Sequence, residues 1–302
     1  MSYSNSIALA SKYVPILDDI YKANARFSVL DTANSDVKFV GANTVLLPKI
    51  SMDGLGNYSR NGGFVNGAVT LAWESKTLSQ DRGRDFVVDV MDDEETMGVA
   101  FGRLAGEFIR TQVVPEIDAY TAATLFAAAS SASNVTQADI SSGASAVAAV
   151  DAVIAQMDND EVPYEGRIMF CSPDFYGYLK AGTTRLVMNR DDNVNYNISM
   201  YNDMRVITVP QSRFVTAITL YDGTTAGQES GGYVTASGAK DINFMIVHPT
   251  AVRKIAKHVA PRIFPTGVWQ QSDGAAFQYR IYHDVFTLDN KLDGIVAHYA
   301  AT

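Results

Sequence analysis

The sequence has one cysteine and no long apolar run, and each absence excludes a class of protein. Cys171 stands alone among 302 residues, so it cannot form an internal disulfide, and a reducing compartment is expected. No stretch approaches the roughly 18 to 20 consecutive apolar residues that a membrane helix needs. The first segment, MSYSNSIALASKYV, lacks the basic and apolar regions of a secretory signal. We therefore expect neither a membrane protein nor a secreted one.

Basic charge is also scarce. The formal net charge is −9 and the pI is near 4.9, which argues against a surface that grips nucleic acid through clustered lysine and arginine. Hydrophobic residues make up 47% of the chain and charged residues 19%, the usual balance of a soluble protein with a substantial core.

Residues that carry catalysis or bind metals are sparse. Cys171 and His248 are one conceivable nucleophile–base pair, but both lie at ends of predicted core strands, where a lone buried cysteine is usually inert. The histidines have no His-x-x-x-His or Cys-x-x-Cys company. DNDE and RDDN lack the spacing of a calcium loop, and no Gly-x-Ser-x-Gly elbow occurs. We predict no catalytic residue, no metal site and no cofactor, and hence no enzyme.

Glycine is concentrated in residues 51–68, SMDGLGNYSRNGGFVNGA, which raises the possibility of a phosphate-binding loop. A dinucleotide fingerprint would need a third glycine where Ser59 stands, and a P-loop would need lysine where Phe64 follows Gly63. The flanks also differ from such loops. VTLAWESKTL alternates as a strand, with Val69, Leu71 and Trp73 on one face, and VKFVGANTVLLPKI before the glycines is rich in β-branched residues. The pattern predicts a long β-hairpin with an adaptable tip.

A long helix is predicted over residues 92–128. Asp92 can cap it, Glu95 completes a capping pattern, and apolar residues follow at helical spacing. Such a rod would span roughly 55 Å at about 1.5 Å per residue, and Pro115 is expected to kink it. Residues 1–36 are expected to form an arm with a short helix after Pro15.

The second half changes character. AVAAVDAVIAQMDND and PDFYGYLK predict helices, and RIMFCS, MRVITVP and INFMIVH predict buried strands, so residues 141–248 are α/β in type. Residues 129–145 are expected to be a connector. AVRKIAKHVAPRIF, AAFQYRIYHDVFTL and GIVAHYAA predict three terminal strands.

One charged segment, SQDRGRDF, has the composition of a contact site. Asp81, Arg82, Arg84 and Asp85 alternate in sign around Gly83, which is expected to lie between two strands. Planar guanidinium groups pair with carboxylates in bidentate geometry, either within the chain or across an interface. The alternative is an exposed turn with weak ion pairs.

The order of these parts, with LSQDRGRDFVVDVMDDEET, VVPEIDAYTAATLF and HPTAVRKIAKHVAPRIF in sequence, resembles the major capsid proteins of tailed bacteriophages with the HK97-type fold. The resemblance covers essentially the whole chain and implies an α+β capsid fold. It divides the chain into an N-terminal arm, an E-loop hairpin, a P-domain strand with the spine helix, an inserted α/β A-domain and C-terminal P-domain strands, at 1–36, 37–84, 85–140, 141–248 and 249–302.

The resemblance implies a structural protein that self-assembles, as pentamers and hexamers, into an icosahedral shell enclosing a phage genome. It implies a scaffolding protein and a portal as partners, a decoration protein in some members, DNA enclosed without sequence-specific binding, and location in the virion, with assembly in the host cytoplasm. Some family members cross-link a hairpin lysine to an asparagine of a neighbour. Lys49 and Lys76 lie on the hairpin arms, but no partner is evident, and no cross-link is predicted.

The predicted hairpin and the charged segment SQDRGRDF supply the candidate contacts between subunits. They are Leu71 and Trp73 on the hairpin and Asp81, Arg82, Arg84 and Asp85 at its base. Three alternatives stay open: an encapsulin-type cellular compartment of the same fold, an enzyme that uses residues 141–248, and a surface or adhesion protein.

Overall fold

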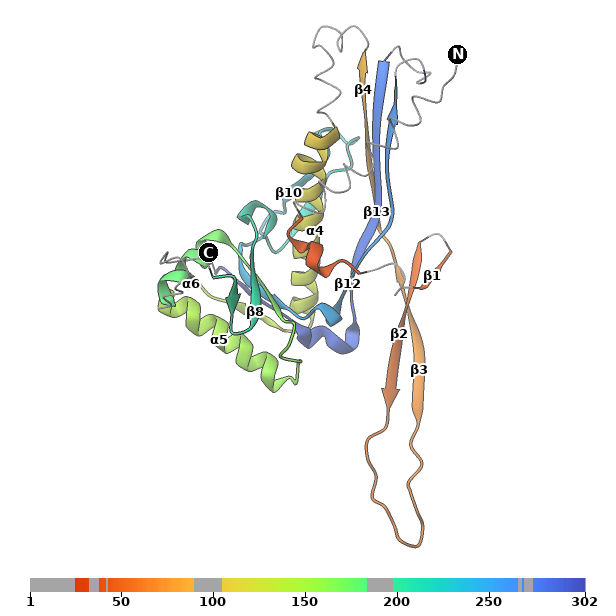
Figure 1. Cartoon of the computed structure of the whole chain (residues 1–302), viewed down its shortest axis with the longest axis vertical. Coiled ribbons are helices and arrows are strands. Elements are labelled where there is room, and N and C mark those ends of the chain that lie inside the picture. The colour runs from red at the N-terminus through yellow and green to blue at the C-terminus, as the bar shows by residue number, and fades with distance from the viewer. Residues whose placement is uncertain are drawn as a thin grey trace, which may run out of the picture.

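The computed structural model describes residues 25–32, 38–41, 43–89, 105–183, 198–265, 268 and 274–301. The expected helix after Pro15 and the expected cap at Asp92 lie outside these ranges. Figure 1 shows a body of sheets and helices, a tall narrow sheet along one side of the central helix α4, and a long hairpin that projects away from the body. The chain is therefore elongated rather than spherical.

The body is built on a six-stranded mixed sheet with strand order β5-β14-β11-β6-β8-β7. Its strands are β5 (Val135–Gln137), β6 (Ile168–Cys171), β7 (Met200–Tyr201), β8 (Met204–Thr208), β11 (Ile242–Val247) and β14 (Ile295–Tyr299). Helix α4 (Val114–Ser131) covers one face, and α5 (Gly143–Asn159) and α6 (Pro173–Gly182) cover the other. These strands and helices confirm the α/β character expected for residues 141–248.

Strand β11 shows why the buried strands of this sheet have nearly continuous runs of apolar residues. Met245 and Val247 pack into the core beneath α4, whereas Phe244 and Ile246 pack into the core beneath α5 and α6. Successive side chains of a strand point to opposite faces, so a strand covered on both faces needs apolar residues at every position.

The last strand corrects the expected grouping of residues 249–302. Strand β14 does not join the other terminal strands; it pairs antiparallel with β11 and parallel with β5 inside the six-stranded sheet. Apolar periodicity identified Ile295–Tyr299 as a strand but carried no information on its partner. Strand β5 is likewise a structured element within residues 129–145, which were expected to be only a connector.

A second sheet, with order β12-β13-β4, forms the tall part of the molecule. It contains β4 (Gln80–Asp89), β12 (Val252–Phe264) and β13 (Gly274–Thr287). Its apolar face packs on the first part of the long helix, where Phe277 and Ile281 meet Ile109 and Val114. Two of the three predicted terminal strands, β12 and β13, thus pair with each other in this sheet, and β13 packs on the helix.

The helix contains the expected irregularity at its proline. Residues 105–108 are α-helical, Ile109–Val113 form a π-helical turn, and Pro115 occupies the first turn of α4. Proline has no N–H to donate to the carbonyl four residues earlier, and the wider π turn immediately before it accommodates that loss. The prediction of an interruption near Pro115 is confirmed; the part of the rod before residue 105 lies outside the described residues.

Smaller elements complete the fold. They are β1 (Lys38–Val40), β2 (Thr44–Met52) and β3 (Val69–Thr77) in a three-stranded sheet, β9 (Ile218–Leu220) and β10 (Tyr233–Thr235) in a two-stranded ribbon, and the short 3₁₀ helices η1 (Phe27–Leu30), η4 (Gln211–Arg213), η5 (Pro249–Ala251) and η6 (Asp289–Gly294).

Candidate assembly surfaces

The predicted hairpin is present and carries one exposed apolar face. Strands β2 and β3 pair antiparallel, and directly opposite residues share a face: Pro48 lies across from Trp73, Ile50 from Leu71 and Met52 from Val69. The relative exposures of Leu71 and Trp73 are 56% and 52%, and that of Met52 is 68%. Contiguous exposed apolar residues of this kind mark interaction surfaces. The placement of Val69, Leu71 and Trp73 on one face is confirmed.

Only the base of the hairpin is anchored in the body. On the opposite face of β2, Val45 and Leu47 are buried against Leu78, Ile255 and Phe286. Near the same place the Lys76 ammonium forms ion pairs with Glu74 and, at 3.4 Å, with Asp289 of η6. Beyond this anchor the ribbon extends into solvent (Figure 1).

The glycine-rich tip is not a phosphate-binding loop. It leads into strand β3 and not into a helix, so no helix N-terminus is available to bind an anion. Gly63 has φ +76° and forms a tight bridge with Ser59. The Tyr58 and Phe64 rings contact each other with centroids 4.9 Å apart, although Phe64 is 87% exposed. The tip thus adds exposed aromatic surface to the hairpin.

The charged segment at the hairpin base lies within one strand. Asp81, Arg82, Arg84 and Asp85 all belong to β4, so the expectation of Gly83 between two strands, and of a turn, is wrong. A single glycine in an otherwise alternating run suggested a break, but Gly83 pairs in register with Arg280 of β13. Because strand side chains alternate, the two aspartates lie on one face and the two arginines on the other.

The two arginines hold the β9–β10 loop (residues 221–232) against the sheet. The Arg82 guanidinium forms a bidentate pair with Glu116 of α4, at 2.7 and 3.1 Å, and also donates to the carbonyl of Tyr221 at 2.8 Å. Arg84 donates to the carbonyl of Glu229 at 3.1 Å. Gly223 has φ +78°, and a Cβ there would lie 2.9 Å from the Arg84 guanidinium. Of the two pairings considered for this segment, within the chain or across an interface, Arg82 therefore forms the one within the chain.

A cavity of about 630 Å³ lies between β4, the long helix and this loop. Its lining includes the apolar side chains of Phe86, Phe108 and Ile281 as well as the two engaged arginines. The described lining includes neither cysteine nor histidine, so it presents no nucleophile–base pair of the thiol–imidazole type.

The face that carries the aspartates is exposed. Asp81 accepts two hydrogen bonds from Arg280, at 2.9 and 2.6 Å. These hydrogen bonds lower the pKa of the Asp81 carboxyl below its usual range. Both partners are largely in solvent, and such a pair contributes little to the stability of one chain.

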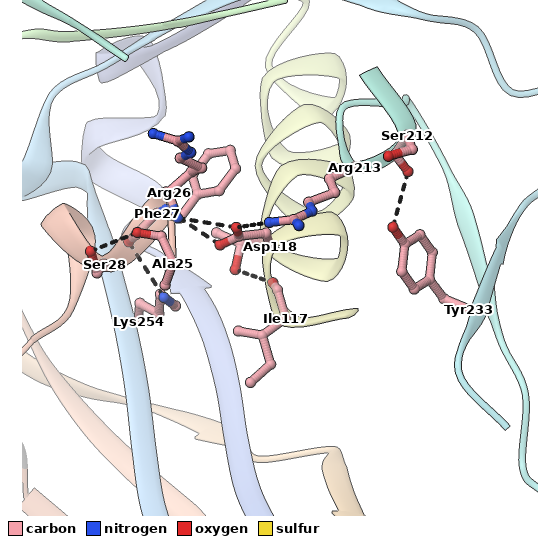
Figure 2. A network of polar contacts seen from close by, with 11 residues as sticks. Ala25, Arg26, Phe27, Ser28, Ile117, Asp118, Ser212, Arg213, Tyr233 and Lys254 are labelled. Atoms are coloured by element: carbon pink, nitrogen blue, oxygen red, sulfur yellow. Dashed lines mark hydrogen bonds and ion pairs between the residues drawn. The ribbon is translucent and has the colours of Figure 1, made fainter. Parts of the chain in front are cut away.

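A buried polar network that the sequence did not reveal holds the N-terminal segment to the body (Figure 2). The carboxylate of Asp118, fully buried on α4, accepts from the backbone N–H groups of Arg26 and Phe27, at 3.1 and 3.4 Å, and from Arg213 at 3.3 Å. Burial raises the pKa of Asp118, and these donors and the nearby Lys254 oppose the rise. An acid within an apolar helical stretch was the only available sequence signal.

Lys254 extends this network across β12. Its ammonium forms an ion pair with Asp31 at 2.8 Å and donates to the carbonyl of Phe27 at 3.4 Å. The Phe27 ring stacks on Phe170 of β6 with centroids 4.4 Å apart. Residues 25–32 are therefore tied to α4, to β12 and to the core of the six-stranded sheet.

The conceivable Cys171–His248 pair does not form. The imidazole of His248 interacts through its two nitrogens with the Thr250 hydroxyl at 2.7 Å and the Glu165 carbonyl at 3.1 Å. Cys171 is buried in the α5–α6 core, and burial raises the pKa of its thiol to about 12. A protonated, buried thiol is a poor nucleophile.

No cluster of three or more metal-binding side chains occurs in the described part of the chain. Within the same ranges, no helix is both long enough and apolar enough to span a membrane.

Comparison with solved structures identifies the fold. The chain is similar to a structure from Mycobacterium phage Ogopogo, with 12% identity, a TM-score of 0.57 and coverage of 91% of each chain. The capsid structure of Cyanophage P-SCSP1u matches at 16% identity and TM-score 0.53, over 90% of this chain and 87% of that one. The mature capsid of bacteriophage PhiM1 matches at 14% identity and TM-score 0.52, over 86% and 83%.

These likenesses show that the chain has a mixed α+β capsid fold, as the sequence resemblance implied. At the level of sequence, no family model matches the chain, and no curated protein does.

Proposed function

We propose that this chain is the major capsid protein of a tailed bacteriophage and self-assembles into the closed icosahedral shell around the phage genome. The observation that carries the proposal is the exposed apolar face of the β2–β3 hairpin, which a lone chain leaves in solvent. The fold of this chain, shared over most of its length with chains from phage capsids, supports the same role.

Neighbouring copies supply the cover that the hairpin lacks. A two-stranded ribbon has no core of its own and is marginal in water. When a second copy covers the face that contains Ile50, Leu71 and Trp73, each 100 Å² of apolar surface removed from water contributes about 2.5 kcal/mol, at about 25 cal/mol per Å². Symmetry repeats this contact between every pair of neighbouring copies, so the modest contributions add up to a stable shell.

The parts of the fold take the roles that the HK97-type architecture assigns. The hairpin is the E-loop, the helix with the β12-β13-β4 sheet is the P-domain, and the six-stranded sheet with α5 and α6 is the A-domain. Because β5 and β14 belong to the six-stranded sheet, the A-domain includes residues 135–137 and 295–299 in addition to those within 141–248. Copies assemble as pentamers and hexamers.

The remaining partners follow from the same role. A scaffolding protein and a portal take part in assembly, which occurs in the host cytoplasm, and some shells of this kind carry a decoration protein. The mature protein resides in the virion. The net charge of −9 suits a shell that encloses DNA without adhering to it.

An encapsulin-type compartment is the alternative with the same fold. The similar structures named above come from phages, which favours the phage shell. A role without catalysis is supported by the buried Cys171 thiol and by the engagement of Arg82 and Glu116 with each other.

Electron microscopy of the purified, concentrated protein tests the proposal. The wild type should form closed shells of uniform size. Leu71→Asp places a charge on the exposed apolar face and should abolish shells while the chain stays folded by circular dichroism. Thr70→Asp is the matched control, because Thr70 is also exposed but lies on the opposite face of the same strand.

Two results would contradict the proposal. One is a wild type that remains a small discrete oligomer under all assembly conditions. The other is equal assembly by Leu71→Asp and Thr70→Asp, which would show that the apolar face of the hairpin takes no part in the shell.

A further inference from the structure

The β12-β13-β4 sheet has one face toward the helix and one face toward solvent. Directly opposite residues share a face, so Arg82, Ile281 and Val259 lie on the helix side. The next row, Gly83, Arg280 and Ala260, lies on the solvent side. Figure 1 shows the helix along one side of this tall sheet. The solvent face is therefore a sheet surface that α4 does not cover.

Charge on the solvent face is sorted by strand. Strand β4 presents Asp81 and Asp85, whereas β12 presents Arg262 and His258, and all four are exposed. The central strand β13 presents Arg280, which Asp81 already engages, and Gln278. These side chains surround a shallow depression of about 370 Å³. The acidic column and the basic column lie on opposite edges of one face.

One row of this face has a charge at each end. Asp85, Gln278 and Arg262 are register partners across the three strands. Two strand spacings separate Asp85 from Arg262, about 9.6 Å between Cα atoms. Neither of them forms an ion pair with any residue in the described part of the chain. Each is available to a partner of opposite charge.

Both columns lie on edge strands. In the order β12-β13-β4, β12 and β4 are the two outer strands of the sheet. An edge strand exposes backbone N–H and C=O groups that favour the approach of another chain. Complementary charge at two edges fits a head-to-tail contact, and such contacts close into rings when the rotation permits.

We propose that a second copy of this chain docks against this sheet, with the acidic column of β4 in one copy facing the basic column of β12 in the next. Asp85 pairs with Arg262 of the neighbouring copy. The proposal rests on the proposed shell function, because copies in a one-layer shell meet side by side. It adds an electrostatic contact that is separate from the apolar contact of the hairpin and that fixes the head-to-tail direction of the copies around a ring.

Charge reversal with rescue is the first test. Asp85→Arg and Arg262→Asp each place like charges across the contact and should lower the yield of shells by about tenfold or more, measured by light scattering and microscopy. The double variant exchanges the two charges and should restore the yield. Each variant must retain the wild-type circular dichroism spectrum. Arg110→Asp is the control, because Arg110 is an exposed arginine on the helix.

A disulfide between copies is the second test. The Asp85→Cys/Arg262→Cys double variant cannot bridge within one chain, because the separation exceeds the roughly 7 Å between Cα atoms that a disulfide spans. Oxidised shells should therefore give a ladder of covalent multimers on a denaturing gel without reductant. Each single-cysteine variant should give no ladder. Cys171, buried with a pKa of about 12, does not compete.

The outcomes separate the two proposals. The charged contact is overturned, while the shell function stands, if three results occur together. The wild type forms shells, both charge-reversal variants assemble like the wild type, and the double-cysteine variant gives no ladder. If both reversals fail and the exchange variant also fails, although it is folded, Asp85 and Arg262 do not pair with each other. If the wild type forms no shells, the shell function is overturned, and the contact with it.

Discussion

The apolar side chains of β11 are buried, whereas those of β3 are exposed. Along β11, Phe244 to Val247 are buried completely, because α4 covers one face of the sheet and α5 and α6 cover the other. Along β3, Val69, Leu71 and Trp73 are each more than half exposed. The first strand obtains its stabilisation from its own chain. The second is apolar on one face only, and in a lone chain nothing in the described part of the structure covers that face.

The difference separates folding from assembly. Burial within the chain contributes to the free energy of unfolding, whereas under the proposed shell function the exposed face of the hairpin contributes only when another copy covers it. Substitutions in the two regions should therefore affect different measurements.

Phe170→Ala should produce the largest loss. Phe170 is fully buried on β6 and stacks on Phe27, so its removal leaves a cavity that also loosens residues 25–32. The free energy of unfolding should fall by about 3–5 kcal/mol, measured by denaturant titration. A loss below about 1 kcal/mol would show that the core of the body is not packed as described.

The free energy of unfolding should depend on pH through the titration of His283. The pKa of His283 is lowered from 6.5 to about 4, mainly by burial and in smaller part by Lys254 and Arg82, while the neighbouring Asp284 opposes the shift. The unfolded chain therefore binds the proton first, so stability is complete above pH 6.5 and is lost as the pH falls toward 4. The loss should reach about 3 kcal/mol at pH 4.

The measurement compares two variants across that range. His283→Gln should lose less stability than the wild type between pH 6.5 and pH 4, because its side chain does not titrate. His258→Gln, at an exposed position on β12, should follow the wild type. Identical pH profiles for wild type and His283→Gln would contradict the assignment.

Arg82→Ala should have an intermediate effect. It leaves Glu116 partly buried without its bidentate partner, removes the Arg82 hydrogen bond to the carbonyl of Tyr221, and removes one of the two donors to the carbonyl of Gly232. The expected loss is about 2 kcal/mol, with faster amide hydrogen exchange in the β9–β10 loop. Arg110→Ala, which removes an exposed pair with Glu107, should leave both measurements close to wild type. Unchanged exchange in the loop would show that Arg82 does not hold it.

Trp73→Ala should have the smallest effect on unfolding and a large effect on shells. Trp73 is 52% exposed, so the free energy of unfolding should change by less than about 1 kcal/mol. The yield of shells should fall strongly in the same preparation. A large loss of stability in the lone chain would remove the contrast between the hairpin and the body.

Local patterns were predictable where neighbours in sequence decide the outcome. Alternation along residues 69–77 predicted both the strand and its apolar face, and the break near Pro115 follows from a missing N–H. The charged segment shows the limit. Its glycine suggested a turn, but pairing with β13 keeps residues 80–89 extended and sends the aspartates and arginines to opposite faces.

The sequence by itself determined the type of most elements, because helix and strand periods are local properties of the chain. Tertiary structure alone decided which strands pair, placing β14 between β5 and β11, and which acid is buried, since Asp118 faces donors that lie more than ninety residues away in sequence. It also decided that Asp85 and Arg262 share one face. Contacts between distant segments depend on the complete fold, and no local pattern encodes them.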